Sequence, residues 1–154
     1  MLFRSERVGR SGRIIGVELS ADMLALARRR VDANGWANVT LIRASMESVR
    51  LPERWDAALF HFTQDVLRSR DALANIFSQS NESARVALAG TKLFPWWLAP
   101  LNLYIWLANR SYVTTFEGLS HPWSLLQQEY VPDLRVRPVW LGASYVASGR
   151  WRGR

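Results

Sequence analysis

The chain has 154 residues, enough for one domain with a real core, and 49% of them are hydrophobic, as in ordinary globular proteins. Its 20 lysines and arginines outnumber 13 aspartates and glutamates, which gives a net charge of +7, but the arginines are scattered along the sequence, so we expect no nucleic-acid partner. Cysteine is absent, which excludes disulfides, thiolate metal sites and a thiol nucleophile.

The first predicted elements are a strand and a helix. Arg13–Glu18 is a short β-branched run, which is typical of a strand. Ser20 is expected to cap the helix that follows, and Asn34-Gly35 to end it. Apolar residues at helical spacing mark one face of this helix: Met23, Leu26, Ala27 and Val31, with Leu24 beside them.

The alternation of strand and helix continues through the middle of the chain. Val39–Ile42 predicts a second strand, Ala44–Leu51 a loop and Trp55–Phe60 a third strand. One helical segment should follow, with an apolar side formed by Val66, Leu73, Ile76 and Phe77. Ala84–Ala89 predicts a fourth strand. Strands that are apolar nearly throughout and alternate with helices indicate a parallel sheet with right-handed crossovers.

The last third of the chain has a different pattern. Phe94–Trp106 is rich in Trp, Leu and Pro, and His121–Gln128 predicts a short helix with Pro122 at its first position. Leu134–Trp140 and Ala143–Val146 predict a hairpin at the edge of the sheet. Pro138 indicates that the first of these strands is partly unpaired.

Residues 12–24, which read Gly-Arg-Ile-Ile-Gly-Val-Glu-Leu-Ser-Ala-Asp-Met-Leu, resemble the second strand and following helix of class I S-adenosylmethionine-dependent methyltransferases. The resemblance is strongest to the branch that contains the ubiquinone and menaquinone biosynthesis enzymes. Trp55–Phe60 resembles the fourth strand of the family, Ala84–Ala89 with Gly90-Thr91-Lys92 the fifth, and the terminal hairpin strands six and seven. The resemblance implies an α/β, Rossmann-like, mostly parallel sheet with a C-terminal antiparallel hairpin. It also implies S-adenosylmethionine as cofactor and a small or lipophilic methyl acceptor.

The chain departs from the family ahead of Arg13. Family members have a first strand that ends in a Gly-x-Gly loop there, whereas only twelve residues precede Arg13 here. We therefore expect residues 1–12 to be a non-native or disordered start, residues 13–149 a partial methyltransferase domain and residues 150–154 a basic tail. Since the absent first strand would lie between the second and fourth, the chain alone should bind cofactor poorly.

The resemblance assigns cofactor-binding roles to residues after the second and third strands. Glu18 would accept hydrogen bonds from the ribose hydroxyls; the alternative is a solvated acid at a strand end. Leu19 would pack on the adenine or, alternatively, in the core. Ser45 and Met46 would lie near the adenine, with Glu47 as the other polar group; the alternative is an ordinary polar loop.

The end of Trp55–Phe60 is the expected position of the methionine half of the cofactor. Phe60 and His61 would contact it, and His61 could act as a general base if the acceptor must lose a proton. The alternative for His61 is a structural hydrogen bond. With two histidines and no cysteine, we expect no metal site.

Phe94–Trp106 leaves three interpretations open. It could form the wall of an acceptor pocket, it could lie peripherally on a membrane, or it could cover the core. For the whole chain, the first hypothesis is a cytoplasmic methyltransferase. The second is a degenerate methyltransferase-like binding module without catalysis, and a weaker third is RNA binding through the arginines.

Overall fold

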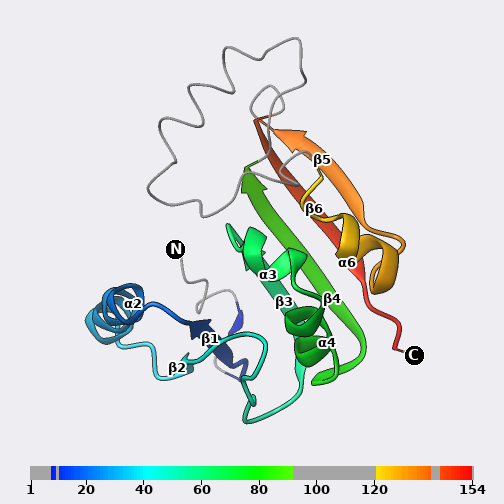
Figure 1. Cartoon of the computed structure of the whole chain (residues 1–154). Helices are drawn as coiled ribbons and strands as arrows, with labels where there is room; N and C mark the ends of the chain where they lie inside the picture. The colour runs from blue at the N-terminus through cyan, green and yellow to red at the C-terminus, as the bar shows by residue number, and fades with distance from the viewer. Residues whose placement is uncertain (1–7, 10, 92–120, 140–142, 154) are drawn as a thin grey trace.

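The computed structural model describes residues 8–9, 11–91, 121–139 and 143–153 (Figure 1). The predicted segment Phe94–Trp106 lies outside these described residues. Within them, no helix is long and apolar enough to cross a membrane.

The strands form two sheets, and both contain a parallel pair (Figure 1). In the first sheet, β1 (Ile14–Glu18) pairs in parallel with β2 (Val39–Arg43), and α2 (Ala21–Ala33) connects them. The second sheet has the order β3-β4-β6-β5, in which β3 (Trp55–His61) and β4 (Ser80–Thr91) are parallel. The predicted α/β fold with parallel strands and a C-terminal antiparallel hairpin is thereby confirmed.

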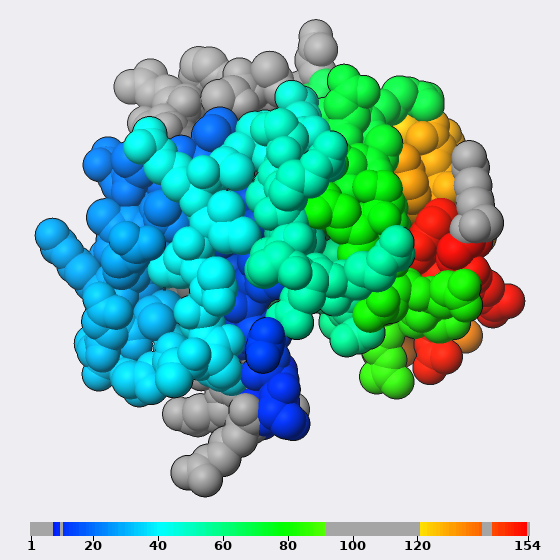
Figure 2. All heavy atoms as spheres, turned by 90° about the horizontal axis from the view of Figure 1, so that it is seen from below, coloured from blue at the N-terminus to red at the C-terminus, as the bar shows by residue number. Residues whose placement is uncertain are grey.

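The boundary between the two sheets falls between β1 and β3. Among the described residues, β1 pairs only with β2, and β3 pairs only with β4. Each therefore presents one edge with unpaired backbone N–H and C=O groups. Seen in space-filling form from below, the blue and cyan atoms of the N-terminal half nevertheless lie against the green atoms of the second sheet (Figure 2).

The helix α2 has the predicted ends, and only part of its predicted apolar face is buried. The Ser20 hydroxyl accepts a hydrogen bond from the Met23 N–H at 3.4 Å, and Gly35 follows the helix with a φ of +64°. Met23 and Leu26 are exposed, whereas Leu24, Ala27 and Val31 are half-buried. The predicted apolar face is therefore correct in part, because the two strands that α2 contacts among the described residues cover Leu24, Ala27 and Val31 and leave Met23 and Leu26 exposed.

The predicted single helical segment is two helices. Ser69 adopts an extended conformation with a ψ of 114°, which ends α3 (Gln64–Arg68). Its hydroxyl accepts a hydrogen bond from the Ala72 N–H and caps α4 (Arg70–Phe77). A serine can offer the backbone this local alternative to a continuous helix.

Strand β4 begins four residues earlier and ends two residues later than Ala84–Ala89, at Ser80 and Thr91. Its pairing with β3 shifts from Trp55–Ser80 to Ala57–Arg85, so β4 carries a bulge. Ser83 lies within that bulge with a φ of +61°. A bulge of this kind is difficult to predict because no glycine marks it.

The predicted C-terminal hairpin forms from β5 (Arg135–Val139) and β6 (Ser144–Arg150), although β6 begins one residue later and ends four residues later than the predicted Ala143–Val146. β6 pairs with β4, which leaves β5 and its Pro138 at the edge of the sheet, where a residue without an N–H is tolerated. The short helix α6 (Ser124–Glu129) begins later than the predicted His121–Gln128, because residues 121–123 form a turn ahead of it.

The core lies between the four-stranded sheet and the helices α3, α4 and α6, which cover one of its faces (Figure 1). Tyr145, only 1% exposed, is its largest fully buried side chain. Its ring lies 4.5 Å from the ring of Trp123, and a Cβ added to Gly90 would come within 3.1 Å of it. Burial raises the pKa of Tyr145 to about 12, because a phenolate would lose its hydration there.

Candidate functional site

Glu18 is the last residue of β1, at the carboxyl end of a parallel strand. Its Oε1 accepts a hydrogen bond from the Ser20 N–H at 2.9 Å, which fixes the orientation of the half-buried carboxylate. Among the described residues, Oε2 receives no hydrogen bond. A fixed carboxylate with a free oxygen can accept hydrogen bonds from a ligand hydroxyl without reorganising.

Leu19 is 67% exposed, which excludes the alternative that it packs in the core. It follows Glu18 directly and precedes the helix α2. The position therefore offers apolar surface beside a carboxylate at the same strand end. Packing on the adenine stays a prediction.

The loop after β2 is a turn in which most of the polar groups already form hydrogen bonds. Ser45 accepts hydrogen bonds through its carbonyl and its hydroxyl oxygen, and the hydroxyl proton remains for a ligand. Met46 is half-buried against the core, and its carbonyl accepts a hydrogen bond from Asn75. The Glu47 carboxylate accepts the Ser69 hydroxyl at 2.8 Å. The Ser45 hydroxyl therefore has a proton to donate, for example to a ring nitrogen, whereas an exocyclic amine is itself a donor and would need a remaining acceptor lone pair of Ser45 or Glu47.

At the end of β3, one side chain lies in the core and the next on the surface. Phe60 is buried in the core, so its ring lies away from the strand edge. His61 is exposed, and its ring meets the Phe62 ring edge-on with centroids 4.7 Å apart. Of the two residues predicted here, only His61 has a side chain available to a ligand.

Two features beside His61 were missed in the sequence. Phe62 has a φ of +57°, the left-handed region that a bulky residue rarely adopts, and its ring is 59% exposed. The Thr63 hydroxyl is buried without a hydrogen-bond partner among the described residues. Gln64 fixes this segment by donating to the Thr91 carbonyl at 2.9 Å. Backbone strain and an unsatisfied hydroxyl are features that concentrate at functional sites.

The strain at Phe62 predicts opposite effects of two substitutions. Phe62→Asn should raise the free energy of unfolding by up to about 1 kcal/mol, because asparagine tolerates the left-handed region. Phe62→Val should lower it by about 1 kcal/mol or more, because a β-branched residue does not. Urea unfolding monitored by circular dichroism measures both. Equal destabilisation by the two variants would contradict a strained backbone.

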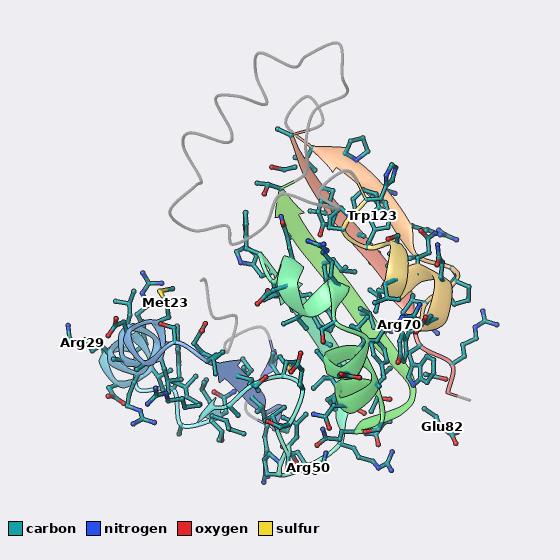
Figure 3. The ribbon with its side chains drawn as sticks, viewed as in Figure 1. Met23, Arg29, Arg50, Arg70, Glu82 and Trp123 are labelled. Atoms are coloured by element: carbon teal, nitrogen blue, oxygen red, sulfur yellow. The ribbon has the colours of Figure 1, made fainter. Side chains whose placement is uncertain are left out.

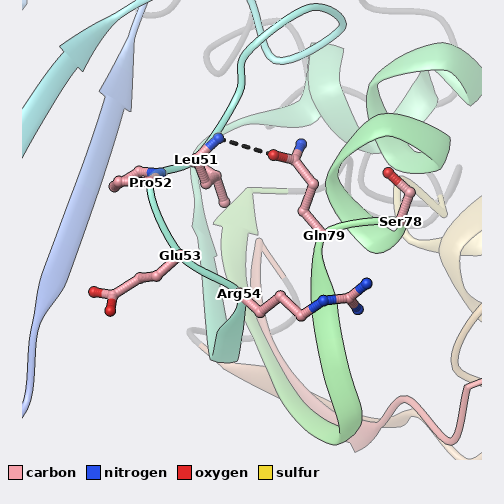
Figure 4. Close-up of a pocket in the computed structure, with 6 residues that line it drawn as sticks. All are labelled: Leu51, Pro52, Glu53, Arg54, Ser78 and Gln79. Atoms are coloured by element: carbon pink, nitrogen blue, oxygen red, sulfur yellow. Dashed lines mark hydrogen bonds between the residues drawn. The ribbon is translucent and has the colours of Figure 1, made fainter.

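The described hollows lie away from Glu18 and His61. One, of about 270 Å³, is formed where the loop before β3 meets the junction of α4 and β4 (Figure 4). There the Leu51 N–H donates to the Gln79 side chain at 2.8 Å. The other, of about 520 Å³, is lined by Tyr130 and Trp151 at the C-terminal end of β6. Both are open and lie near the amino end of β4, opposite the end that carries Thr91.

No three His, Cys, Asp or Glu side chains in the described part of the chain gather as a group that could hold a metal ion. Since the arrows of β1, β3 and β4 point in the same general direction in Figure 1, the ends that carry Glu18 and His61 lie toward one side of the molecule. This side therefore combines a carboxylate with a free oxygen, exposed apolar and aromatic side chains and a histidine.

Comparison with known proteins gives a consistent result. Residues 2–83 match the family described as "Methyltransferase domain". No curated protein sequence matches the chain significantly. Among solved structures, the chain is similar to a SAM-dependent methyltransferase from Aquifex aeolicus, with 19% identity, a TM-score of 0.62 and coverage of 96% of this chain and 73% of that one.

Two further solved structures share the fold. The N-methyltransferase NodS from Bradyrhizobium japonicum WM9 is 10% identical, with a TM-score of 0.62 and coverage of 92% of this chain and 74% of that chain. An rRNA methylase from Streptococcus thermophilus is 13% identical, with a TM-score of 0.56 and coverage of 97% and 79%. NodS was also solved in complex with S-adenosyl-L-homocysteine.

Proposed function

Because the chain belongs to the methyltransferase domain family, we propose that it is a cytoplasmic protein that binds S-adenosylmethionine at the carboxyl ends of β1, β2 and β3. This proposal rests mainly on the position and hydrogen bonding of Glu18. Its position at a strand end, its fixed orientation and its free Oε2 suit the two hydroxyls of a ribose.

Other described residues fit the remaining parts of the cofactor. Exposed Leu19 offers apolar surface for the adenine, and the Ser45 hydroxyl can donate or accept beside it. His61 and the strained Phe62 lie where the methionine half and the acceptor would meet. The bound cofactor would supply an activated methyl group, so the protein has only to align the acceptor and exclude water.

For the acceptor, we propose a small or lipophilic molecule, as in the ubiquinone and menaquinone branch. The exposed Leu19 and Phe62 side chains support this class. If the acceptor carries a hydroxyl, exposed His61 could receive its proton as a general base. A structural role for His61 has less support, because its imidazole makes no hydrogen bond among the described residues.

We further propose that the cofactor site of this chain is incomplete. The divided sheet supports this, because a strand seated between β1 and β3 would supply the wall that the described residues lack. The same observation favours the second candidate function, a binding module that has kept the fold without catalysis. The two differ in whether cofactor binds at all.

Calorimetric titration with S-adenosyl-L-homocysteine tests the proposal. We expect a Kd of about 1 mM or weaker, since the described residues supply no strand between β1 and β3 to complete the site. Ligand-detected NMR extends the measurement to such weak binding, with adenosine as the competitor. Tight binding would overturn the proposal that the site is incomplete. The absence of any binding that adenosine displaces would overturn the cofactor proposal and favour the binding module.

A further inference from the structure

The four-stranded sheet has a second face, which is opposite the helices α3, α4 and α6. Strand alternation and the pairing register assign its residues. We call this the open face, and its members are Ala57, Leu59, His61, Arg85, Ala87, Ala89, Thr91, Arg135, Arg137, Val139, Ser144, Val146, Ser148 and Arg150. No described helix covers it.

The centre of the open face is apolar. Leu59 is 59% exposed and lies beside Ala87, while Val146 is 45% exposed and lies beside Ala89. These residues come from β3, β4 and β6, three neighbouring strands. A contiguous apolar patch in the middle of a sheet is typical of a surface that another element covers.

The rim of the open face is basic and contains no acidic residue. Arg85 and Arg150 are directly paired across β4 and β6, although like charges in opposite positions destabilise a sheet. Arg135 and Arg137 project from the edge strand β5. All four arginines are exposed, and among the described residues none forms an ion pair. Arginines far apart in the sequence are thus gathered around one apolar centre, and the one carboxylate bonded to any of them, Asp133, accepts the Arg150 backbone N–H at 3.3 Å and forms no ion pair with it among the described residues.

We propose that the open face docks an amphipathic helix whose apolar stripe is flanked by Asp and Glu. A helix about 10 Å wide lying along β4 would cover the neighbouring strands, which are about 4.8 Å apart. Its apolar stripe would meet Leu59 and Val146, and its acidic flank would reach Arg135 and Arg137. If it runs antiparallel to β4, its C-terminal carbonyls would lie over Arg85 and Arg150, where cations are favourable.

The surface fits a helix better than the phosphate backbone of a nucleic acid. Proteins that bind single strands stack bases on aromatic side chains, and the open face has only His61 as a ring among its members. The β3–β4 pair is also parallel, and parallel strands are typically covered by helices on both faces. The charge and the apolar centre together therefore specify an acidic helix.

Selection from a displayed helix library tests the proposal on the full chain. Each helix has about 18 residues, a fixed leucine stripe at i, i+3, i+4 and i+7, and flanking positions randomised among Glu, Lys and Gln. We expect Glu to be enriched at the flanks. A synthetic selected helix should bind the double variant Arg135→Glu/Arg137→Glu at least about tenfold more weakly than the parent, as charge complementarity requires.

The matched control is Arg28→Glu/Arg29→Glu, which makes the same charge change on the exposed surface of α2 (Figure 3). It should leave binding of the selected helix unchanged. Equal loss in the control, or no preference for Glu over Lys, would overturn the proposal. So would binding of a single-stranded RNA or an anionic vesicle through Arg135 and Arg137 without binding of the acidic helices. Circular dichroism checks folding, and Arg135→Gln/Arg137→Gln replaces the reversal if it unfolds the chain.

Discussion

Glu18→Gln should weaken the binding of S-adenosyl-L-homocysteine at least about tenfold, because hydrogen bonds to a charged group contribute about 1.5–3 kcal/mol. Glutamine keeps the size of the side chain, and its carbonyl can still accept the Ser20 N–H. The variant therefore keeps the local backbone and loses the charge and the second acceptor. Ligand-detected NMR at matched ligand concentrations measures the difference.

Glu82→Gln is the matched control for Glu18→Gln. Glu82 is an exposed acid in the bulged part of β4, near the amino end of that strand, and its removal makes the same change in net charge (Figure 3). We expect it to bind the ligand as the parent does. If both variants lose affinity equally, the effect comes from net charge, and the assignment of the ribose to Glu18 fails.

The elements that were correctly predicted are those with a strong local signal. The strands β1, β2 and β3 are short apolar runs, and Ser20 and Asn34-Gly35 bracket α2 as capping rules require. The C-terminal hairpin was predicted from two strand-like runs joined by a short connection. These features depend on neighbours in the sequence, which is why a single sequence suffices for them.

The errors come from features that depend on tertiary contacts. Met23 and Leu26 have the apolar character of a packed face, but the two strands beneath α2 cover only Leu24, Ala27 and Val31. Leu19, for which core packing was only one of two alternatives, is exposed beside this helix. A periodic pattern indicates that a face is apolar but not how much of it finds a partner.

The candidate site was predictable where it depended on strand ends and not where it depended on backbone conformation. Glu18 and His61 lie at the carboxyl ends of β1 and β3, as the sequence indicated. Phe60 was placed with them, although the alternation of a strand points its ring to the core. The positive φ of Phe62 has no sequence signal, because a phenylalanine there contradicts local preference.

The basic rim of the open face was also not predictable from the sequence. The arginines were judged to be scattered, which argued against an anionic partner, yet strand pairing brings Arg85 opposite Arg150 and places Arg135 and Arg137 two strands from β4. Charge clustering in a sheet depends on register, and register cannot be read from linear spacing.

Tyr145→Ala should lower the free energy of unfolding by about 3–5 kcal/mol, the range for removing a buried aromatic ring. Tyr145 is almost fully buried, packs on Trp123 and lies over Gly90, so the cavity has little chance to collapse. Tyr145→Phe keeps the ring and should preserve most of this stability at neutral pH. Urea unfolding measures both, and equal losses would show that the hydroxyl rather than the ring stabilises the core.

The free energy of unfolding of the parent should also depend on alkaline pH more steeply than that of Tyr145→Phe. The pKa of Tyr145 is raised from 10.0 to about 12 in the folded state by burial, so the unfolded state releases its proton first as pH rises. The stability contributed by the neutral phenol is therefore complete below pH 10 and is lost as pH rises toward 12. The parent should lose about 2–3 kcal/mol more than Tyr145→Phe over this interval, because each unit of pKa difference corresponds to about 1.4 kcal/mol. If stability fell equally with pH in the two proteins, the phenol would ionise in the folded state as readily as in the unfolded chain. That outcome would contradict a pKa raised by burial against Trp123.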